Sequence, residues 1–180
     1  HLHKAARTIE AAGEFPKSHA DWLKLPGVGL YTAAAIASIG LGEAVAAVDG
    51  NVQRVVSRWA CITDPVDEKI GALAVQAVAD AWLDHEAPGN HNQAVMELGA
   101  LVCSPRTPLC ERCPLSTSCA SANQPDMWRI LPTKQPKKKA IRWELKWHIV
   151  RFENFTVTIQ RQETGVWAKL WAFPESTPPS

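Results

Sequence analysis

Four of the five cysteines in this chain lie close together, in a segment that begins at residue 103. Their spacing is C-x6-C-x2-C-x5-C, and the thiols belong to Cys103, Cys110, Cys113 and Cys119. Four thiolates are a ligand set both for structural zinc and for [4Fe–4S] clusters. Structural zinc usually uses two C-x2-C pairs, and only one such pair is present here. The segment therefore predicts a metal centre, and the spacing alone leaves both metals open.

A carboxylate, Asp49, stands in the sequence AVDGNVQRV, directly before an expected helix. An aspartate at that position commonly caps the helix N-terminus, and this structural role requires no chemistry. The helix dipole favours negative charge there, so the carboxylate stays ionised. A fixed carboxylate can also stabilise positive charge that develops on a substrate during a reaction. Both roles are compatible with the sequence.

Two glycines stand one residue apart in LPGVGLYTAAAIAS, which spans residues 25–38. Glycine permits positive φ and close backbone approach, and Gly27 and Gly29 directly precede an expected helix. The unpaired N–H groups at such a helix start bind anions, including DNA phosphate. An ordinary helix-loop-helix turn is the alternative, because short glycine motifs arise often without function.

Helices are the elements that must position these residues. The clearest is an apolar stripe from Ile70 to Trp82, with one-sided helical spacing. Gly40 and Gly42 are expected to end the helix after the glycine pair, and Pro88-Gly89 to interrupt the chain before the last helix. Helical patterning is expected over residues 1–12, 21–25, 31–39, 51–60, 70–82 and 93–102.

The sequence pattern changes near Pro132. Residues 132–143 are rich in proline and lysine, which is typical of a linker. Their basic run, Lys137 to Lys139, is expected to be solvated, with a non-specific DNA contact as the alternative. Beyond the linker, Phe155, Val157 and Ile159 alternate with polar residues as in a strand, after a turn at Glu153-Asn154. This second part is too short to form a stable sheet alone.

The overall composition neither requires nor excludes a polyanionic partner, because the formal net charge is only +1. An apolar fraction of 46% predicts a globular chain. No apolar run approaches the length of a membrane span, so no membrane partner is expected. The chain begins at His1 with no signal peptide, so a processed chain and a fragment of a longer protein are both open interpretations.

Three motifs together resemble one protein family. LPGVGxxTAxAI resembles the helix-hairpin-helix of DNA-repair glycosylases, and VDGNV follows it about twenty residues later, as in the endonuclease III superfamily. HNQAVMELGALVC, residues 91–103, resembles the corresponding segment of MutY-type adenine DNA glycosylases. The resemblance covers most of residues 1–131. It implies a mainly α helix-hairpin-helix glycosylase fold with an iron–sulfur cluster loop, followed by the start of a small α+β Nudix-like domain.

The resemblance also implies roles for single residues. Asp49 would face C1′ of a flipped nucleotide, with Asn51 as its orienting partner. Bifunctional members, which cut the backbone through a Schiff base, carry lysine where this chain has Tyr31, so no imine intermediate is expected. The hairpin would hold DNA phosphate without reading sequence through Leu25, Pro26, Gly27, Val28 and Gly29.

For the cysteine segment, the resemblance favours a [4Fe–4S] cluster over zinc, in a structural role. It also implies that Arg106 and Arg112 point toward DNA phosphates, and ordinary solvation is the alternative for these arginines. The implied organisation is a partial glycosylase domain over residues 1–131 without its N-terminal helices, a basic linker over 132–143, and a truncated Nudix-like domain for 8-oxoguanine recognition over 144–180. The general-acid glutamate would lie upstream, so the fragment alone is expected to be inactive.

The expected function is therefore base-excision repair. A monofunctional adenine DNA glycosylase would hydrolyse the N-glycosidic bond of adenine paired with 8-oxoguanine or guanine in double-stranded DNA. The alternatives are an endonuclease III-like glycosylase for oxidised pyrimidines and a non-catalytic iron–sulfur DNA-binding module. A monomer is expected, in the cytoplasm with the nucleoid, or in the nucleus or mitochondrion of a eukaryote.

Overall fold

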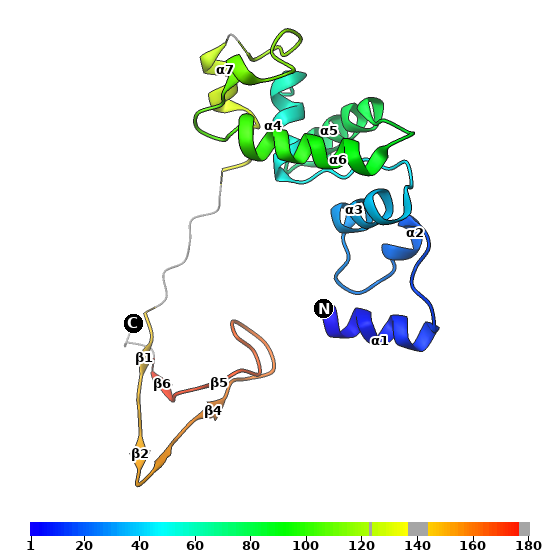
Figure 1. The fold of residues 1–180 in the computed structure, drawn as a ribbon. Helices are drawn as coiled ribbons and strands as arrows, with labels where there is room; N and C mark the ends of the chain where they lie inside the picture. The colour runs from blue at the N-terminus through cyan, green and yellow to red at the C-terminus, as the bar shows by residue number, and fades with distance from the viewer. Residues whose placement is uncertain (123, 137–143, 177–180) are drawn as a thin grey trace. The chain divides into compact units, whose positions relative to one another are not determined.

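The computed structural model describes residues 1–122, 124–136 and 144–176, which fall into two compact units, His1–Pro136 and Lys137–Ser180 (Figure 1). The lysines of the basic run at 137–139 lie outside the described residues. In the described parts of both units, no helix is long and apolar enough to cross a membrane.

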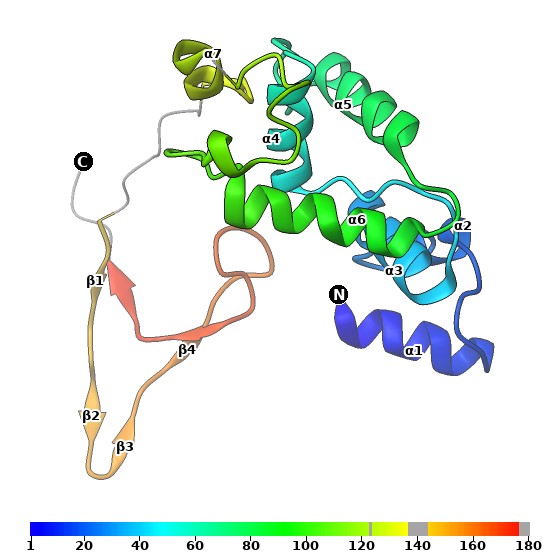
Figure 2. The same cartoon turned by 45° about the horizontal axis from the view of Figure 1, so that its top comes forward.

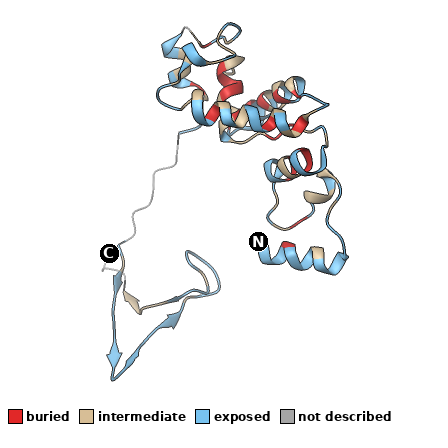
Figure 3. Ribbon diagram, viewed as in Figure 1, coloured by how far each residue is buried: buried red, intermediate tan, exposed pale blue. Residues whose placement is uncertain are grey.

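The described part of the first unit is helical. Its elements are α1 (Leu2–Ala12), α2 (His19–Trp22), α3 (Leu30–Leu41), α4 (Gly50–Trp59), α5 (Lys69–Trp82), α6 (Pro88–Glu97), the π-helix η1 (Leu98–Val102), the 3-10 turn η2 (Cys110–Arg112) and α7 (Pro125–Ile130). Buried residues concentrate in α3 to α6, whereas Ala5 is the buried residue of α1 (Figure 3). These helices therefore form the framework of the candidate site.

The α2–α3 hairpin differs slightly from the expected boundaries. The short α2 starts earlier than expected because the Ser18 hydroxyl accepts a hydrogen bond from the Asp21 N–H at 3.1 Å. Gly42 ends α3 in a left-handed conformation, with φ of 70°, as expected of a C-terminal glycine. Gly40 was also expected to end this helix, but it lies inside α3, where a single glycine is tolerated.

The core lies where α4 and α5 pack together. Val52 and Val56 of α4 meet Val66 and Val75, and all four are at most 3% exposed. Apolar residues of α6, among them Val95, cover this cluster. At the C-terminal ends of α4 and α5, the rings of Trp59 and Trp82 meet edge to face, with centroids 4.4 Å apart.

The helix after Pro88-Gly89 begins earlier than the sequence indicated. We expected it at residue 93, but Pro88 occupies the first turn of α6, where its missing N–H costs nothing. Gly89 lets this turn approach α3, because a Cβ there would stand 2.8 Å from the Ser38 carbonyl oxygen. At its other end, α6 continues into the π-helix η1, a rare geometry that occurs often near functional sites.

The second unit contains three antiparallel pairs of two-residue strands among its described residues. The pairs are β1 (Lys146–Trp147) with β6 (Glu175–Ser176), β2 (Arg151–Phe152) with β3 (Phe155–Thr156), and β4 (Ile159–Gln160) with β5 (Trp171–Ala172). The turn expected at Glu153-Asn154 is confirmed, and Glu153 has a φ of 52° there. The single strand expected from Phe155 to Ile159 is wrong, because Val157 and Thr158 separate β3 from β4.

Candidate functional site

Asp49 occupies the N-cap of α4, with an extended backbone. Its Oδ1 accepts hydrogen bonds from the N–H groups of Asn51 at 2.9 Å and Val52 at 2.8 Å. Its Oδ2 accepts a third bond, at 3.1 Å, from the Asn51 amide Nδ2. These three hydrogen bonds, at the positive end of the helix dipole, fix the direction of the carboxylate.

A chain of polar contacts runs from Asp49 to the cysteine segment. The Arg54 guanidinium Nη2 donates to the Asn51 Oδ1 at 2.8 Å and to the Gly99 carbonyl at 2.6 Å. Its Nε donates to the Cys103 carbonyl at 2.7 Å. Burial and the neighbouring Arg58 guanidinium lower the pKa of Arg54 below its usual value, although Cys103 and Asp49 act in the opposite direction. Asn51 is thus held from both sides, and α4 is joined to η1.

The hairpin presents the N-terminus of α3. Gly27 adopts a φ of 85°, and a Cβ there would lie 2.3 Å from the His1 Cβ, so both the backbone and the space require glycine. Gly29 is the N-cap residue of α3, and a Cβ there would meet nothing within 4 Å. Leu25 is buried, and its carbonyl accepts from the Val28 N–H at 3.1 Å across Pro26. The first-turn N–H groups of α3 therefore lie directly after this glycine loop, where they have no acceptor within the helix.

Tyr31 lies in the first turn of α3, and its side chain reaches α6. The Tyr31 hydroxyl lies 3.9 Å from the Met96 sulfur, and the residue is 42% exposed. In the described part of the chain, no hydrogen bond joins Tyr31 to Asp49. The structure thus brings Asp49 and Asn51 together, and it places Tyr31 at the junction of the hairpin with α6.

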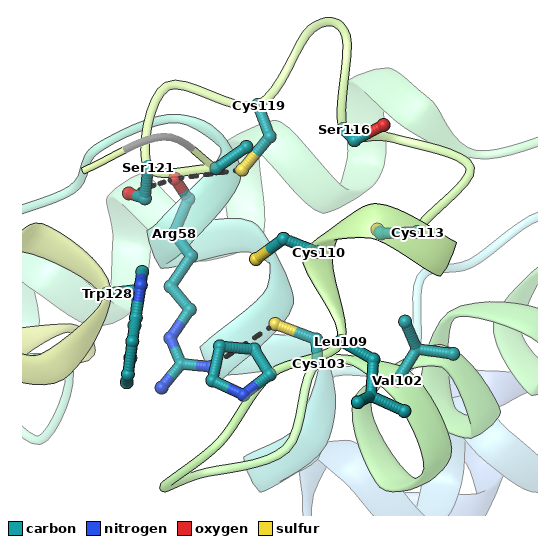
Figure 4. A pocket seen from close by; sticks show the side chains of 12 residues that line it. Arg58, Val102, Cys103, Leu109, Cys110, Cys113, Ser116, Cys119, Ser121 and Trp128 are labelled. Carbon is teal, nitrogen blue, oxygen red and sulfur yellow. Dashed lines mark hydrogen bonds between the residues drawn. The ribbon is translucent and has the colours of Figure 1, made fainter. Parts of the chain in front are cut away.

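The four clustered cysteines line one cavity (Figure 4). Cys103 follows η1, Cys110 and Cys113 lie at the two ends of η2, and Cys119 lies in the loop beyond. All four are free thiols. Burial and the neighbouring thiols raise the pKa of Cys110 and of Cys119. Among the described residues, no three His, Cys, Asp or Glu side chains converge on one point as a single metal ion requires.

A buried arginine reaches the same cavity from α4. Arg58 is 3% exposed, and its Nη1 lies 3.4 Å from the Cys103 sulfur (Figure 4). The ring of Trp128 lies 5.9 Å from its guanidinium carbon. The guanidinium donates to three carbonyls, those of Ser104, Pro105 and Leu131. The guanidinium therefore joins the start of the cysteine segment to Leu131, the residue that follows α7.

Arg106 and Arg112 are exposed, and neither forms an ion pair with another described residue. Arg106 lies in the loop between the first two cysteines, and Arg112 ends η2. Both are therefore accessible to an anionic partner.

The sequence reasoning did not detect Arg54 and Arg58. A signal was present: Asn51, Arg54 and Arg58 are spaced three and four residues apart, so they share one face of an expected helix. Two arginines on the same face as a candidate site residue indicate a polar network. Asn92 and Gly99 were also missed, because only the fold shows their contacts with segments more than 40 residues away.

Comparisons with known proteins agree on one superfamily. The helix-hairpin-helix motif matches residues 10–39. The chain is 34% identical to the adenine DNA glycosylase of Arabidopsis thaliana, over 96% of this chain and 30% of the relative. It is 43% identical to the adenine DNA glycosylase of Homo sapiens, over 72% of this chain and 24% of the relative. One from Buchnera aphidicola is 31% identical, over 97% of this chain and 50% of the relative.

The solved structures point the same way. A thermostable thymine-DNA glycosylase is similar with a TM-score of 0.60 and 30% identity, over 67% of this chain and 56% of that one. Endonuclease III in a non-covalent DNA complex has a TM-score of 0.54 and 27% identity, over 66% and 55% of the two chains. The chain spans half or less of the length of the curated relatives cited here. The predicted helix-hairpin-helix glycosylase fold is confirmed.

Proposed function

We propose that this relative of the MutY-type adenine DNA glycosylases hydrolyses the N-glycosidic bond of adenine paired with 8-oxoguanine or guanine. The observation that carries the proposal is the Asp49 carboxylate, held by two backbone N–H groups and the Asn51 amide at the start of α4. The similarity to adenine DNA glycosylases supports adenine as the base.

The chemistry of the bond explains why a fixed carboxylate is useful. As adenine departs, the sugar acquires positive charge, and an anion that is already oriented stabilises that charge without further reorganisation. The hydrogen bonds to Asp49 fix the direction of the carboxylate. Arg54 in turn fixes the direction of the Asn51 amide. It donates to the amide oxygen and leaves Nδ2 to donate to Asp49.

Base removal without strand cleavage follows from Tyr31. A Schiff-base lyase needs an amine at the reacting sugar, and the corresponding position carries a phenol. The protein would therefore leave an abasic site in an intact strand.

The hairpin and the exposed arginines would bind double-stranded DNA. The N–H groups at the start of α3 suit one phosphate, and Arg106 and Arg112 add positive charge on the cysteine segment. Endonuclease III, which has a similar fold, has been solved in complex with DNA. Residues 144–180 would begin a Nudix-like domain that recognises 8-oxoguanine.

The four thiols would hold a [4Fe–4S] cluster. A single ion draws all its ligands within one bond length, whereas a four-iron cluster binds each thiolate at a different iron. Four thiols that line one cavity supply the ligand set of such a cluster. When bound, the cluster would cross-link η1, η2 and the following loop, while Arg58 balances its negative charge.

The test is adenine release from a duplex with one A:8-oxoguanine pair, measured under single-turnover conditions with the full-length protein. We expect Asp49→Asn to lower the rate about 10²–10³-fold, because it keeps the shape of the side chain and removes the charge. Duplex affinity should not change. Asp84→Asn is the matched control, since Asp84 accepts from Glu86 and Ala87 N–H groups in the same way.

Three outcomes would contradict parts of the proposal. Unchanged activity in Asp49→Asn would remove Asp49 from the chemistry. Duplex binding without any base release by the parent protein would favour an iron–sulfur DNA-binding module. A covalent adduct after borohydride treatment would favour an endonuclease III-like glycosylase for oxidised pyrimidines.

A further inference from the structure

The helix formed by α6 and η1 contacts the chain on both sides of Asp49. Asn92 of α6 bonds to Ala47, two residues before Asp49. Gly99 of η1 packs against Asn51, two residues after it. Asn92 and Gly99 are seven residues apart, which is about two helical turns, and both are buried. Figure 2 shows α6 extending from α3 toward α4. We call the contacts of Asn92 and Gly99 the flanking contacts.

In the contact before Asp49, both polar atoms of one buried side-chain amide form hydrogen bonds. Asn92, at 4% exposure, accepts from the Ala47 N–H at 3.0 Å through Oδ1. Its Nδ2 donates to the Val45 carbonyl and to the Ser38 hydroxyl, each at 2.9 Å. Ser38 belongs to α3, so one side chain ties the incoming segment to two helices. Buried amides bonded in this way are fixed in direction.

The contact after Asp49 depends on the absence of a side chain. A Cβ on Gly99 would lie 2.6 Å from the Asn51 Cβ and 2.9 Å from its carbonyl oxygen. Glycine therefore lets η1 reach the first turn of α4. The Gly99 carbonyl accepts from Arg54, which also holds the Asn51 amide. The position of η1 thus determines where Asn51 stands.

We propose that Asn92 and Gly99 are positioning residues for glycosidic bond cleavage, because they fix the backbone on both sides of Asp49. The inference rests on the proposed function for its catalytic consequence. Asp49 takes its direction from the N–H groups of Asn51 and Val52, so a shift of the backbone turns the carboxylate. Displacement of a reacting group by about 1 Å costs roughly 10²-fold in rate.

Asn92→Asp tests the first flanking contact. The substitution keeps an acceptor for the Ala47 N–H but places an oxygen against the Val45 carbonyl, which should push that segment away. Asn90→Asp is the matched control, because Asn90 is exposed on the same helix. In single-turnover assays we expect Asn92→Asp to lower the rate constant roughly 10²-fold, with unchanged amplitude and duplex affinity. Asn90→Asp should behave as the parent protein.

Gly99→Ala tests the second contact without removing a hydrogen-bonding group. Gly40→Ala is its control, since Gly40 is also helical and a Cβ there meets nothing within 4 Å. We expect a rate constant at least about tenfold lower for Gly99→Ala and an unchanged one for Gly40→Ala. If Asn92→Asp does not fold, Gly99→Ala decides the question.

A purely structural role would give a different result. It would lower the amplitude, which counts folded enzyme, and leave the rate constant of the remaining molecules unchanged, and this would overturn the proposal. Amide hydrogen exchange supplies a readout that needs no activity. In Asn92→Asp, exchange of the N–H groups of Asn51 and Val52 should accelerate at least about tenfold, while that of Val56 in the same helix stays unchanged.

The two readouts separate this inference from the proposed function. A parent protein that releases no adenine contradicts the proposed function, and the exchange result then still decides whether Asn92 orients Asp49. Unchanged exchange at Asn51 and Val52, with an unchanged rate constant, would overturn the inference while the proposed function stands.

Discussion

At the scale of single residues, the candidate site is a series of polar side chains in which each fixes the next. Asp49 is held by Asn51, Asn51 by Arg54, and Arg54 by the carbonyls of Gly99 and Cys103. Each bond to Arg54 involves a charged donor, and such bonds are about twice as strong as neutral ones. The orientation of the carboxylate therefore depends on a residue that does not contact it.

Arg54→Lys should show this dependence. Lysine keeps the charge, but it lacks the planar fork that reaches an amide and two carbonyls at once. We expect the single-turnover rate of adenine release to fall about 10–10²-fold, because Asn51 loses its fixed direction. The control is Arg7→Lys, an exposed position on α1. A rate equal to that of the parent would show that Asn51 needs no support from Arg54.

At the scale of elements, the two hairpin glycines have different reasons to be glycine. Gly27 needs it for the fold, because its φ is positive and His1 fills the space where a side chain would go. Gly29 has an ordinary φ of −94° and open space around it. Nothing within the described chain excludes a side chain there, so the fold itself does not require glycine at position 29.

Substitution of the two glycines should therefore affect two different properties, the stability of the fold and the binding of duplex DNA. Gly27→Ala is expected to destabilise the fold by about 1–2 kcal/mol or more, from the left-handed backbone and the contact with His1. Gly29→Ala should change the free energy of unfolding by less than about 1 kcal/mol and weaken duplex binding instead. Thermal unfolding and fluorescence anisotropy with a labelled duplex measure the two effects. Unchanged duplex affinity in Gly29→Ala would exclude close phosphate contact at this glycine.

At the scale of the whole chain, the two units differ in how much core they contain. The first unit buries its apolar residues between α3 and α6, whereas the described strands of the second leave large apolar side chains exposed, such as Phe152, Phe155 and Trp171. The first unit also carries all the candidate site residues. The hydrophobic core and the candidate site therefore both lie in the first unit, which also holds the four clustered cysteines.

Metal content is the prediction that belongs to this scale. The purified protein should be brown and contain about four iron atoms per chain, with little zinc. Cys113→Ser should lose the iron and unfold at lower temperature, because the cysteine segment loses its cross-link. Cys61→Ser is the control, since Cys61 does not line the cavity of the four clustered cysteines. A colourless protein with stoichiometric zinc would contradict the cluster.

Most of the helices could be predicted from the sequence, because apolar periodicity indicates which face of each helix is buried. The start of α6 was misplaced because proline and glycine indicate an interruption, although proline also suits a first helical turn. The cap at Asp49 is local, so the residues around it were enough to predict it, whereas its Asn51 partner was implied by the family resemblance. The contacts of Asn92 and Gly99 depend on how α6 packs, and no local pattern records that packing.

The buried Arg58 has a consequence for the cell that makes this protein. A guanidinium that is 3% exposed is costly to bury without an anion beside it, and the Cys103 sulfur, 3.4 Å away, is where the proposed cluster would supply that negative charge. Chains that lack the proposed cluster would open at this point and be removed by proteases. Iron supply would then set how much of the folded protein the cell contains.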